Sequence, residues 1–156
     1  MFEEKRVPDR QIRAAQTDTT VRVYRSCPPA VADAALEKQT LGQGGSVAVT
    51  PSFRLAAHDS DNGRKPGHER VLAVDLTRDG FERALQGHVE WVPERDLDHT
   101  PLNFQAIRLV GGHADEWITA VTDVTPVVRD IAGLLATDQL HLAVKLVPHE
   151  PPYERG

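Results

Sequence analysis

Apolar and polar residues alternate with a period of two at several places along the chain, a pattern typical of half-buried strands. This alternation predicts strands at residues 20–26, 46–50, 69–77, 88–92 and 104–110. The strand at 69–77 is apolar enough to be expected at the centre of a sheet. Residues 114–125 stay open between helix and strand, because their first half fits a helical face and their second half favours a strand.

Helical spacing of apolar residues predicts four helices and one short helical turn. The helices cover residues 29–38, 79–85, 126–136 and 139–146, and the turn covers 52–57. Pro28 and Pro29 favour the start of the first helix, and Thr77 and Asp138 are the expected N-caps of the second and the last.

The order of these elements predicts the class of fold. Strand, helix, strand, strand, helix, strand, strand and then helices is not the regular alternation that builds a parallel sheet. We therefore expect an α+β fold with one mixed or mostly antiparallel sheet and flanking helices. The chain is interpreted as a single domain over residues 1–156, with 1–10 and 151–156 frayed.

Length and composition fit one globular domain. The chain has 156 residues, of which 40% are hydrophobic and 26% charged. It contains no apolar run near the roughly 20 residues of a membrane span, and its charged start lacks the apolar core of a signal peptide. The lone Cys27 cannot form an internal disulfide, which favours a reducing compartment. We expect a soluble cytoplasmic protein with no membrane partner.

The charge is unevenly distributed along the chain. Residues 1–78 carry 12 Lys and Arg against 10 Asp and Glu, whereas residues 79–156 carry 6 against 13. Binding to duplex DNA needs a basic face, which this balance does not favour. Duplex DNA is therefore an unlikely partner, although a local basic pocket remains compatible with the sequence.

Several familiar catalytic motifs are absent from the sequence. Neither Ser46 nor Ser52 stands in a Gly-x-Ser-x-Gly motif, and there is no phosphate-binding loop of the Gly-Lys-Ser/Thr kind. The seven His are scattered without the spacing of a metal site, so we expect no metal cofactor. Cys27 is interpreted as a small packing residue.

Three short patches carry candidate chemistry, each beside a plainer interpretation. Residues 90–95, around Trp91, either form a solvated strand face or place a carboxylate beside a cleft. In residues 51–53, the Ser52 hydroxyl either contacts a ligand or caps a turn. Residues 65–70 are either a basic ligand-binding loop or only a loop before a strand.

Motifs spread over most of the chain resemble the bacterial family catalogued as domain of unknown function 4291. They are DRQIRA (9–14), TVRVY (20–24), AVADAAL (30–36), PSF (51–53), KPGHERVLA (65–73), WVPERDL (91–97), DEWI (115–118) and DVTP (123–126). The sequence departs from the family at 48–50, where AVT replaces Trp-Ile-Lys, and at 54–59, which replaces an aromatic and Met-rich run. A family segment is also missing between Leu85 and Val89. If the lost Lys and Trp belong to the family's active site, this member has changed or abandoned that chemistry.

The order of elements also resembles the small ADP-ribosyltransferase-like fold. That resemblance implies NAD as a substrate, with Tyr24 or Arg25 holding it, Ser52 positioning it, and Glu94, or less favourably Glu90, gripping the ribose. It makes Glu94, Ser52 and Tyr24 the candidate catalytic residues. The diphosphate would be held by cationic side chains, and the candidates are Arg13, Arg25, Lys65 and Arg70.

These residue types suit cleavage of the bond between nicotinamide and ribose. Such a reaction passes through an oxocarbenium-like transition state, as glycoside cleavage does. A fixed carboxylate stabilises the developing positive charge and can bind a ribose hydroxyl. The first hypothesis is therefore an NAD-using transferase or glycohydrolase whose acceptor, a protein, nucleic acid or small molecule, is unknown.

Two alternatives belong to other classes. One is a non-catalytic descendant that binds a nucleotide or a partner protein, and the other is a small-molecule enzyme that uses His58 and Asp59 for acid–base chemistry. The transferase requires Ser52 and Glu94 to face each other across a cleft, whereas a plain salt bridge of Glu94 would favour the binding protein. It also requires the first two strands and the Trp91 strand to share one sheet.

Overall fold

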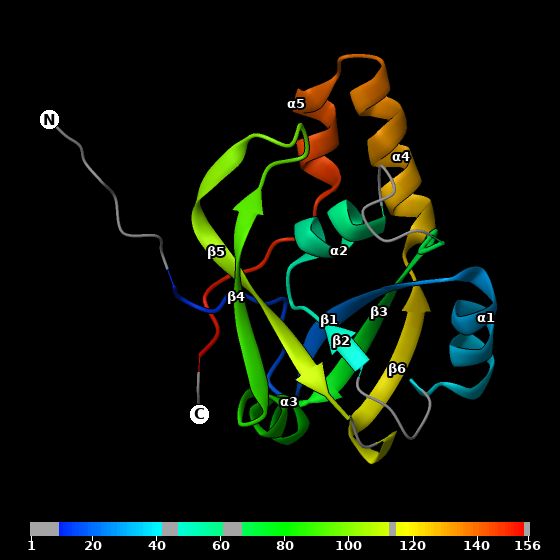
Figure 1. Cartoon of the computed structure of the whole chain (residues 1–156), viewed down its shortest axis with the longest axis vertical. Coiled ribbons are helices and arrows are strands. Elements are labelled where there is room, and N and C mark those ends of the chain that lie inside the picture. Colours follow the sequence, from blue (N-terminus) through cyan, green and yellow to red (C-terminus); the bar gives the residue numbers. More distant parts are fainter. Residues whose placement is uncertain (1–9, 42–46, 61–66, 113–114, 155–156) are drawn as a thin grey trace, which may run out of the picture.

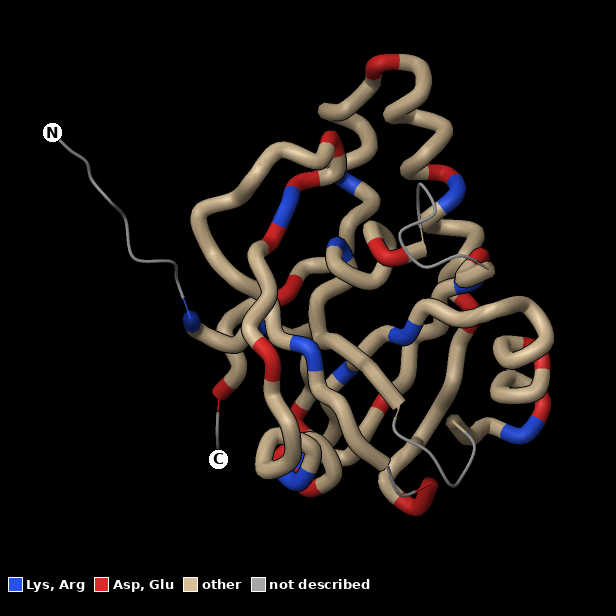
Figure 2. The backbone as a smooth tube through the Cα atoms, viewed as in Figure 1, with Lys and Arg blue, Asp and Glu red and all other residues tan. Residues whose placement is uncertain are grey.

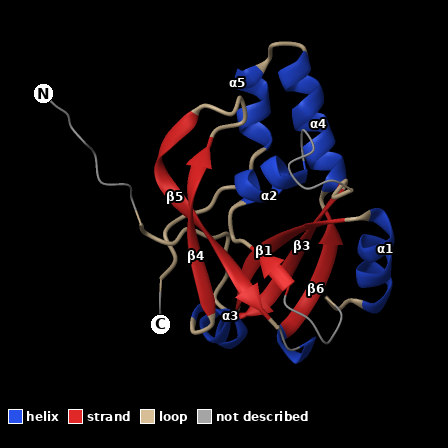
Figure 3. Cartoon of the chain, viewed as in Figure 1, coloured by secondary structure: helices blue, strands red, loops and turns tan. Residues whose placement is uncertain are grey.

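The strands of this protein form two antiparallel three-stranded sheets, flanked by helices (Figures 1 and 3). The computed structural model describes residues 10–41, 47–60, 67–112 and 115–154. The first sheet has the order β1 (Thr20–Cys27), β3 (Arg70–Thr77) and β6 (Ile118–Asp123), and the second has the order β2 (Val47–Val49), β5 (Pro101–Gly111) and β4 (His88–Arg95). The predicted α+β class is confirmed.

The central position expected for residues 69–77 is also confirmed. β3 pairs with β1 on one side and with β6 on the other, and Val71, Leu72 and Val74 are fully buried. Residues on both faces of this strand are buried because core side chains cover the first sheet from both sides. One core cluster, which includes Val74, joins the two sheets, and the other, which includes Val71, joins the first sheet to helices.

The expectation of one sheet that includes β1, β2 and β4 is wrong. β1 belongs to the first sheet, whereas β2 and β4 belong to the second. Among the described residues, backbone pairing joins the two sheets at one bridge, between Tyr24 and Thr50, whose backbone groups exchange hydrogen bonds of 2.6 and 3.0 Å. Pro51 follows Thr50 directly and α2 begins at Phe53, so the chain leaves β1 after this one bridge.

Five α-helices flank the sheets in the described part of the chain. They are α1 (Pro29–Lys38), α2 (Phe53–Ser60), α3 (Arg78–Leu85), α4 (Thr125–Ala136) and α5 (Leu140–Ala143), with short 3₁₀ turns η1 (Asp115–Trp117) and η2 (Val144–Leu146). The predicted helix at 139–146 is therefore split, and Asp138 is not its N-cap but has a left-handed backbone with φ of 62°. None of these helices is long and apolar enough to cross a membrane in the part of the chain that the structure describes.

Helix α2 holds a central place between the sheets and the C-terminal helices (Figure 1). Phe53 and Ala56 on α2 belong to a buried cluster with Tyr24 of β1, Ile131 of α4 and Ala143 of α5. The predicted single turn at 52–57 is thus a longer helix whose apolar face is buried. This packing fixes the start of α2, and with it the residues that precede the helix.

The two ends of the described chain pair with each other. Ala14 N–H donates to the carbonyl of Pro151 at 3.0 Å, and Tyr153 N–H donates to the carbonyl of Ile12 at 2.7 Å. The fraying expected from residue 151 onward is therefore wrong for residues 151–153. This pairing places the segments around Arg13 and Glu150 side by side, which shapes the cavity described next.

Candidate functional site

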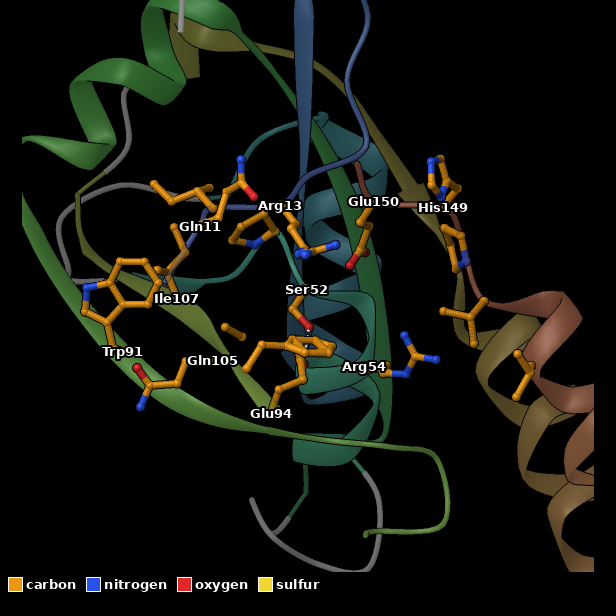
Figure 4. A pocket seen from close by; sticks show the side chains of 17 residues that line it. Gln11, Arg13, Ser52, Arg54, Trp91, Glu94, Gln105, Ile107, His149 and Glu150 are labelled. Carbon is orange, nitrogen blue, oxygen red and sulfur yellow. Dashed lines mark hydrogen bonds between the residues drawn. The ribbon is translucent and has the colours of Figure 1, made fainter. Parts of the chain in front are cut away.

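A cavity of about 310 Å³ lies where the paired chain ends meet the start of α2 and the second sheet (Figure 4). Its walls come from residues 11–13, 51–54 and 147–150, together with parts of β4 and β5. Five segments that are far apart in the sequence therefore contribute to one small space.

Ser52 and Glu94 meet at this cavity. The Ser52 hydroxyl donates a hydrogen bond of 2.7 Å to the Glu94 carboxylate, and both residues are buried. Ser52 follows Pro51 and acts as a cap of α2, since its oxygen also accepts the N–H of Leu55 at 3.1 Å. The two side chains thus touch each other at the cavity wall, whereas the transferase hypothesis expects them to face each other across a cleft. Among the described residues Glu94 forms no salt bridge, which is the contact expected for the binding protein.

A strand irregularity distinguishes Glu94 from Glu90. The pairing of β4 with β5 shifts register between Pro93 and Arg95, and such a bulge redirects a side chain. Glu94 is consequently buried at the cavity, whereas the Glu90 side chain is 55% exposed and lies 3.5 Å from Arg108. Of the two candidate carboxylates, only Glu94 lines the cavity.

Glu150 is a second carboxyl group in the cavity, and no motif or spacing in the sequence points to it. It accepts the backbone N–H of Phe53 at 2.8 Å, at the positive end of α2. Burial, reinforced by the nearby charge of Glu94, raises the pKa of Glu150 to about 8. Burial also raises the pKa of Glu94, although the Ser52 hydrogen bond, Arg54 and Arg13 act in the opposite direction.

Cationic and aromatic side chains complete the lining. Arg13 lies over the Phe104 ring, with 5.5 Å from the guanidinium carbon to the ring centroid, and Arg54 lies 3.4 Å from Asp96. Trp91 also faces the cavity, with Arg10 above its ring. Figure 4 shows Ser52 between Glu94 and Glu150, with Arg13 and Arg54 nearby. Such a site offers carboxyl groups, cations and flat apolar surfaces to one ligand.

A family comparison covers nearly all of the chain. The model described as a domain of unknown function (DUF4291) matches residues 11–90 and 86–153. The chain belongs to the DUF4291 family. The two matched stretches meet at residues 86–90, the place where the resemblance implies a missing segment. Searches among curated proteins and among solved structures found no match.

In this member of the DUF4291 family, Tyr24 lies in the core beside the cavity and does not line it. Its side chain is buried and packs edge-on against Phe53, with 5.4 Å between ring centroids. Burial and the charge of Glu150 raise the pKa of its hydroxyl well above the ordinary value, while Arg22 acts against that rise. Tyr24 therefore packs against the first residue of α2 and helps to fix where that helix begins.

Two of the predicted cofactor-binding residues lie elsewhere in the fold. Arg25 donates to the carbonyl of Leu41 at 3.3 Å, and Arg70 binds Asp33 and Asp123 at 3.1 and 2.6 Å. Neither lines the cavity: alternation along β1 directs Arg25 away from the Tyr24 side, and Arg70 faces α1 and β6. Lys65 lies outside the described residues. Of the predicted cationic residues, the structure brings Arg13 alone to the cavity, and it adds Arg54.

His58 and Asp59 have separate partners. Asp59 is buried and binds Arg108 at 2.8 Å, whereas Nδ1 of His58 lies 3.0 Å from Nδ1 of His99. The carboxylate of Asp59 is thus committed to an ion pair. Within the described ranges, no group of three or more His, Cys, Asp or Glu side chains is arranged to hold a metal.

Proposed function

We propose that the cavity binds NAD in the cytoplasm and cleaves the bond between nicotinamide and ribose, passing ADP-ribose to an acceptor or to water. The observation that supports this best is the hydrogen bond between Ser52 and Glu94 at the cavity wall. It fixes a carboxylate in one orientation, which stabilisation of an oxocarbenium-like transition state requires.

The two carboxyl groups suit different tasks. With a pKa raised to about 8, Glu150 is mostly protonated at neutral pH and can donate a hydrogen bond to the bound ligand. It need not donate a proton, because the cationic nicotinamide ring of NAD leaves as a neutral molecule. Burial raises the pKa of Glu94, whereas the Ser52 hydrogen bond and the charges of Arg54 and Arg13 act toward the ionised form, the form that stabilises positive charge on the ribose. Neighbouring acids with different environments are typical of glycosidic bond cleavage.

The size of the cavity limits how much of the ligand it encloses. About 310 Å³ is at the lower end of the roughly 300–1,000 Å³ usual for ligand sites. We infer that the cavity encloses the nicotinamide riboside half, with Trp91 or Phe104 against the planar ring. Arg13 and Arg54 are then the side chains available to the diphosphate.

The strands fail the requirement set by the resemblance to the ADP-ribosyltransferase-like fold, since β1 lies in one sheet and β2 and β4 in the other. The transferase proposal therefore rests on the side chains of the cavity and not on that fold. Two observations favour the alternative of a binding protein without catalysis. Tyr24 and Arg25 lie outside the cavity, and residues 48–50 are AVT, where the family resemblance implies Trp-Ile-Lys. In this alternative the same cavity holds a nucleotide without cleaving it.

Calorimetry combined with a nicotinamide-release assay distinguishes these proposals. We expect NAD or ADP-ribose to bind in the micromolar range, and Glu94→Gln to keep binding within about threefold while lowering nicotinamide release at least 100-fold. Glu90→Gln is the matched control on the same strand, with its side chain 55% exposed, and should behave like wild type.

The other possible results of calorimetry and of the release assay favour the binding protein or refute a proposal. Binding without nicotinamide release by the wild type would support the non-catalytic alternative. Absence of binding to NAD, ADP-ribose and nicotinamide would refute both nucleotide proposals. Equal loss of release in Glu90→Gln and Glu94→Gln would remove the role assigned to Glu94.

A further inference from the structure

Three polar pairs connect α2 to the end of β4 and the turn that follows it. Ser52 binds Glu94 at 2.7 Å, Arg54 lies 3.4 Å from Asp96, and His58 lies 3.0 Å from His99. The first pair belongs to the cavity described above. The third pair, which we call the histidine pair, lies farther along α2 and has no part in the proposed function.

The histidine pair brings two ring nitrogens to one point. The Nδ1 atoms are 3.0 Å apart, with ring centroids at 4.8 Å and ring planes tilted by 55°. A hydrogen bond between them places a proton on one Nδ1 and a lone pair on the other. Two imidazoles bound to one tetrahedral zinc ion at about 2.05 Å would have their nitrogens about 3.4 Å apart, so a small opening of the pair admits a metal.

The backbone fixes His99 in this position. His99 has a φ of 69°, in the left-handed region that residues other than glycine seldom adopt. Its N–H donates to the carbonyl of Asp96 at 2.9 Å, and Asp96 N–H donates to the carbonyl of Thr100 at the same distance. The turn is therefore closed by its own hydrogen bonds and presents the imidazole toward His58.

The histidine pair also lines a second cavity of about 310 Å³ on another side of α2. Apolar residues of α4, among them Val128, Ile131 and Leu135, form one wall. Arg54 lines both this cavity and the first one. A metal held by the pair would consequently face a space where water or an exogenous ligand can complete its coordination.

We propose that His58 and His99 bind a divalent transition metal of the zinc type through both Nδ1 atoms, with the proton of each ring on Nε2. Neutral imidazole prefers Zn²⁺, Cu²⁺ and Ni²⁺ over hard cations such as Mg²⁺ and Ca²⁺. With two protein ligands, the site leaves coordination positions open. The metal ties α2 to the turn after β4, next to Ser52, which precedes α2, and Glu94, which lies near the end of β4.

Titration of metal-free protein with Zn²⁺ by calorimetry tests this site. We expect one zinc ion per chain at micromolar affinity, and a rise in melting temperature on zinc addition. His58→Gln and His99→Gln should each weaken binding at least tenfold and abolish the thermal shift. His141→Gln on α5 is the control and should bind as the wild type does. Glu94→Gln should also keep zinc binding, which separates this proposal from the proposed function.

A wild-type measurement keeps the test valid if a variant fails to fold. In imidazole ¹⁵N spectra, stoichiometric zinc should shift the Nδ1 signals of two rings among the seven His. No zinc binding by the wild type, unchanged binding in folded His58→Gln and His99→Gln, or equal weakening by His141→Gln would each overturn the proposal.

Discussion

At the scale of single residues, Glu150 differs most from what its local sequence indicates. It stands among prolines near the end of the chain, yet it is half-buried and accepts the first backbone N–H of α2, that of Phe53. Burial favours the protonated form of this carboxyl group and raises its pKa from the ordinary 4.5 to about 8. The group thus links stability to pH as well as serving the proposed chemistry.

Replacing Glu150 by Gln should change the pH dependence of stability. Between pH 4.5 and 8 the folded protein holds the Glu150 proton more tightly than the unfolded chain, so the free energy of unfolding falls as pH rises. The slope from one such group is at most about 1.4 kcal/mol per pH unit. Glu150→Gln keeps an oxygen for the Phe53 N–H and loses this decline, so its stability relative to wild type should increase toward pH 8.

Urea denaturation at pH 5, 6.5 and 8 measures this difference. Glu90→Gln, on an exposed stretch of β4, is the control and should follow the wild-type pH profile. Parallel profiles for Glu150→Gln and wild type would show that Glu150 is not buried as described.

At the scale of elements, α2 and α3 each begin with a side-chain cap, and the two caps differ in whether the capping hydroxyl also binds another buried side chain. The Thr77 hydroxyl accepts the N–H of Gly80 at 3.0 Å and makes no other hydrogen bond among the described residues. Ser52 accepts the N–H of Leu55 on α2 and also donates to buried Glu94. The α2 cap therefore couples the stability of a helix to the candidate site.

Ser52→Ala should accordingly cost more stability than Thr77→Ala. Loss of a helix cap costs about 1 kcal/mol, and an unsatisfied buried acceptor costs roughly 1–3 kcal/mol more. We expect losses of about 2 kcal/mol or more for Ser52→Ala and about 1 kcal/mol for Thr77→Ala in urea denaturation. Equal losses would mean that the hydrogen bond between Ser52 and Glu94 contributes nothing to stability.

The contrast between these helices also explains what the sequence can predict. α3 was predictable because its start at Thr77 and its end near Gly87 are local signals. α2 was underestimated because Asp59 looks like the start of a loop, whereas it is buried in an ion pair with Arg108, 49 residues away. Partners distant in sequence, such as His58 and His99 or Phe53 and Glu150, leave no local signal.

At the scale of the whole molecule, the α+β class and the antiparallel pairing were predictable, but the division into two sheets was not. Alternation along a strand indicates which side chains face the core, but not which other strand is the hydrogen-bonded partner. β2 pairs with β5, about 60 residues farther along, and among the described residues its backbone link to β1 is the single bridge at Thr50, just after β2. The charged residues, interspersed over the described part of the chain (Figure 2), give no sign of this division either.

Thr50 is the point where the two sheets are joined. Its backbone pairs with Tyr24 of the first sheet, and its hydroxyl donates to the carbonyl of Ile107 in the second at 2.5 Å. The hydroxyl also accepts the N–H of Ser52 at 3.1 Å. All of these groups are buried, so one side chain stabilises the junction and the approach to α2 together.

Thr50→Val should destabilise the whole molecule by about 2 kcal/mol, because the isosteric side chain leaves buried polar groups without a partner. The sheets share one core cluster, with Val23 and Leu72 from the first and Val49 and Leu109 from the second, so unfolding should remain one transition.

Trp91 on β4 and Trp117 before β6 allow each sheet to be followed separately. Fluorescence of the two single-tryptophan proteins, Trp91→Phe and Trp117→Phe, should give coincident urea transitions with and without Thr50→Val. Thr119→Val is the control, because its exposed hydroxyl donates to the carbonyl of Asp75, and it should cost less than about 0.5 kcal/mol. If Thr50→Val separated the two transitions, the junction at Thr50 rather than the shared core would be what makes the sheets unfold together.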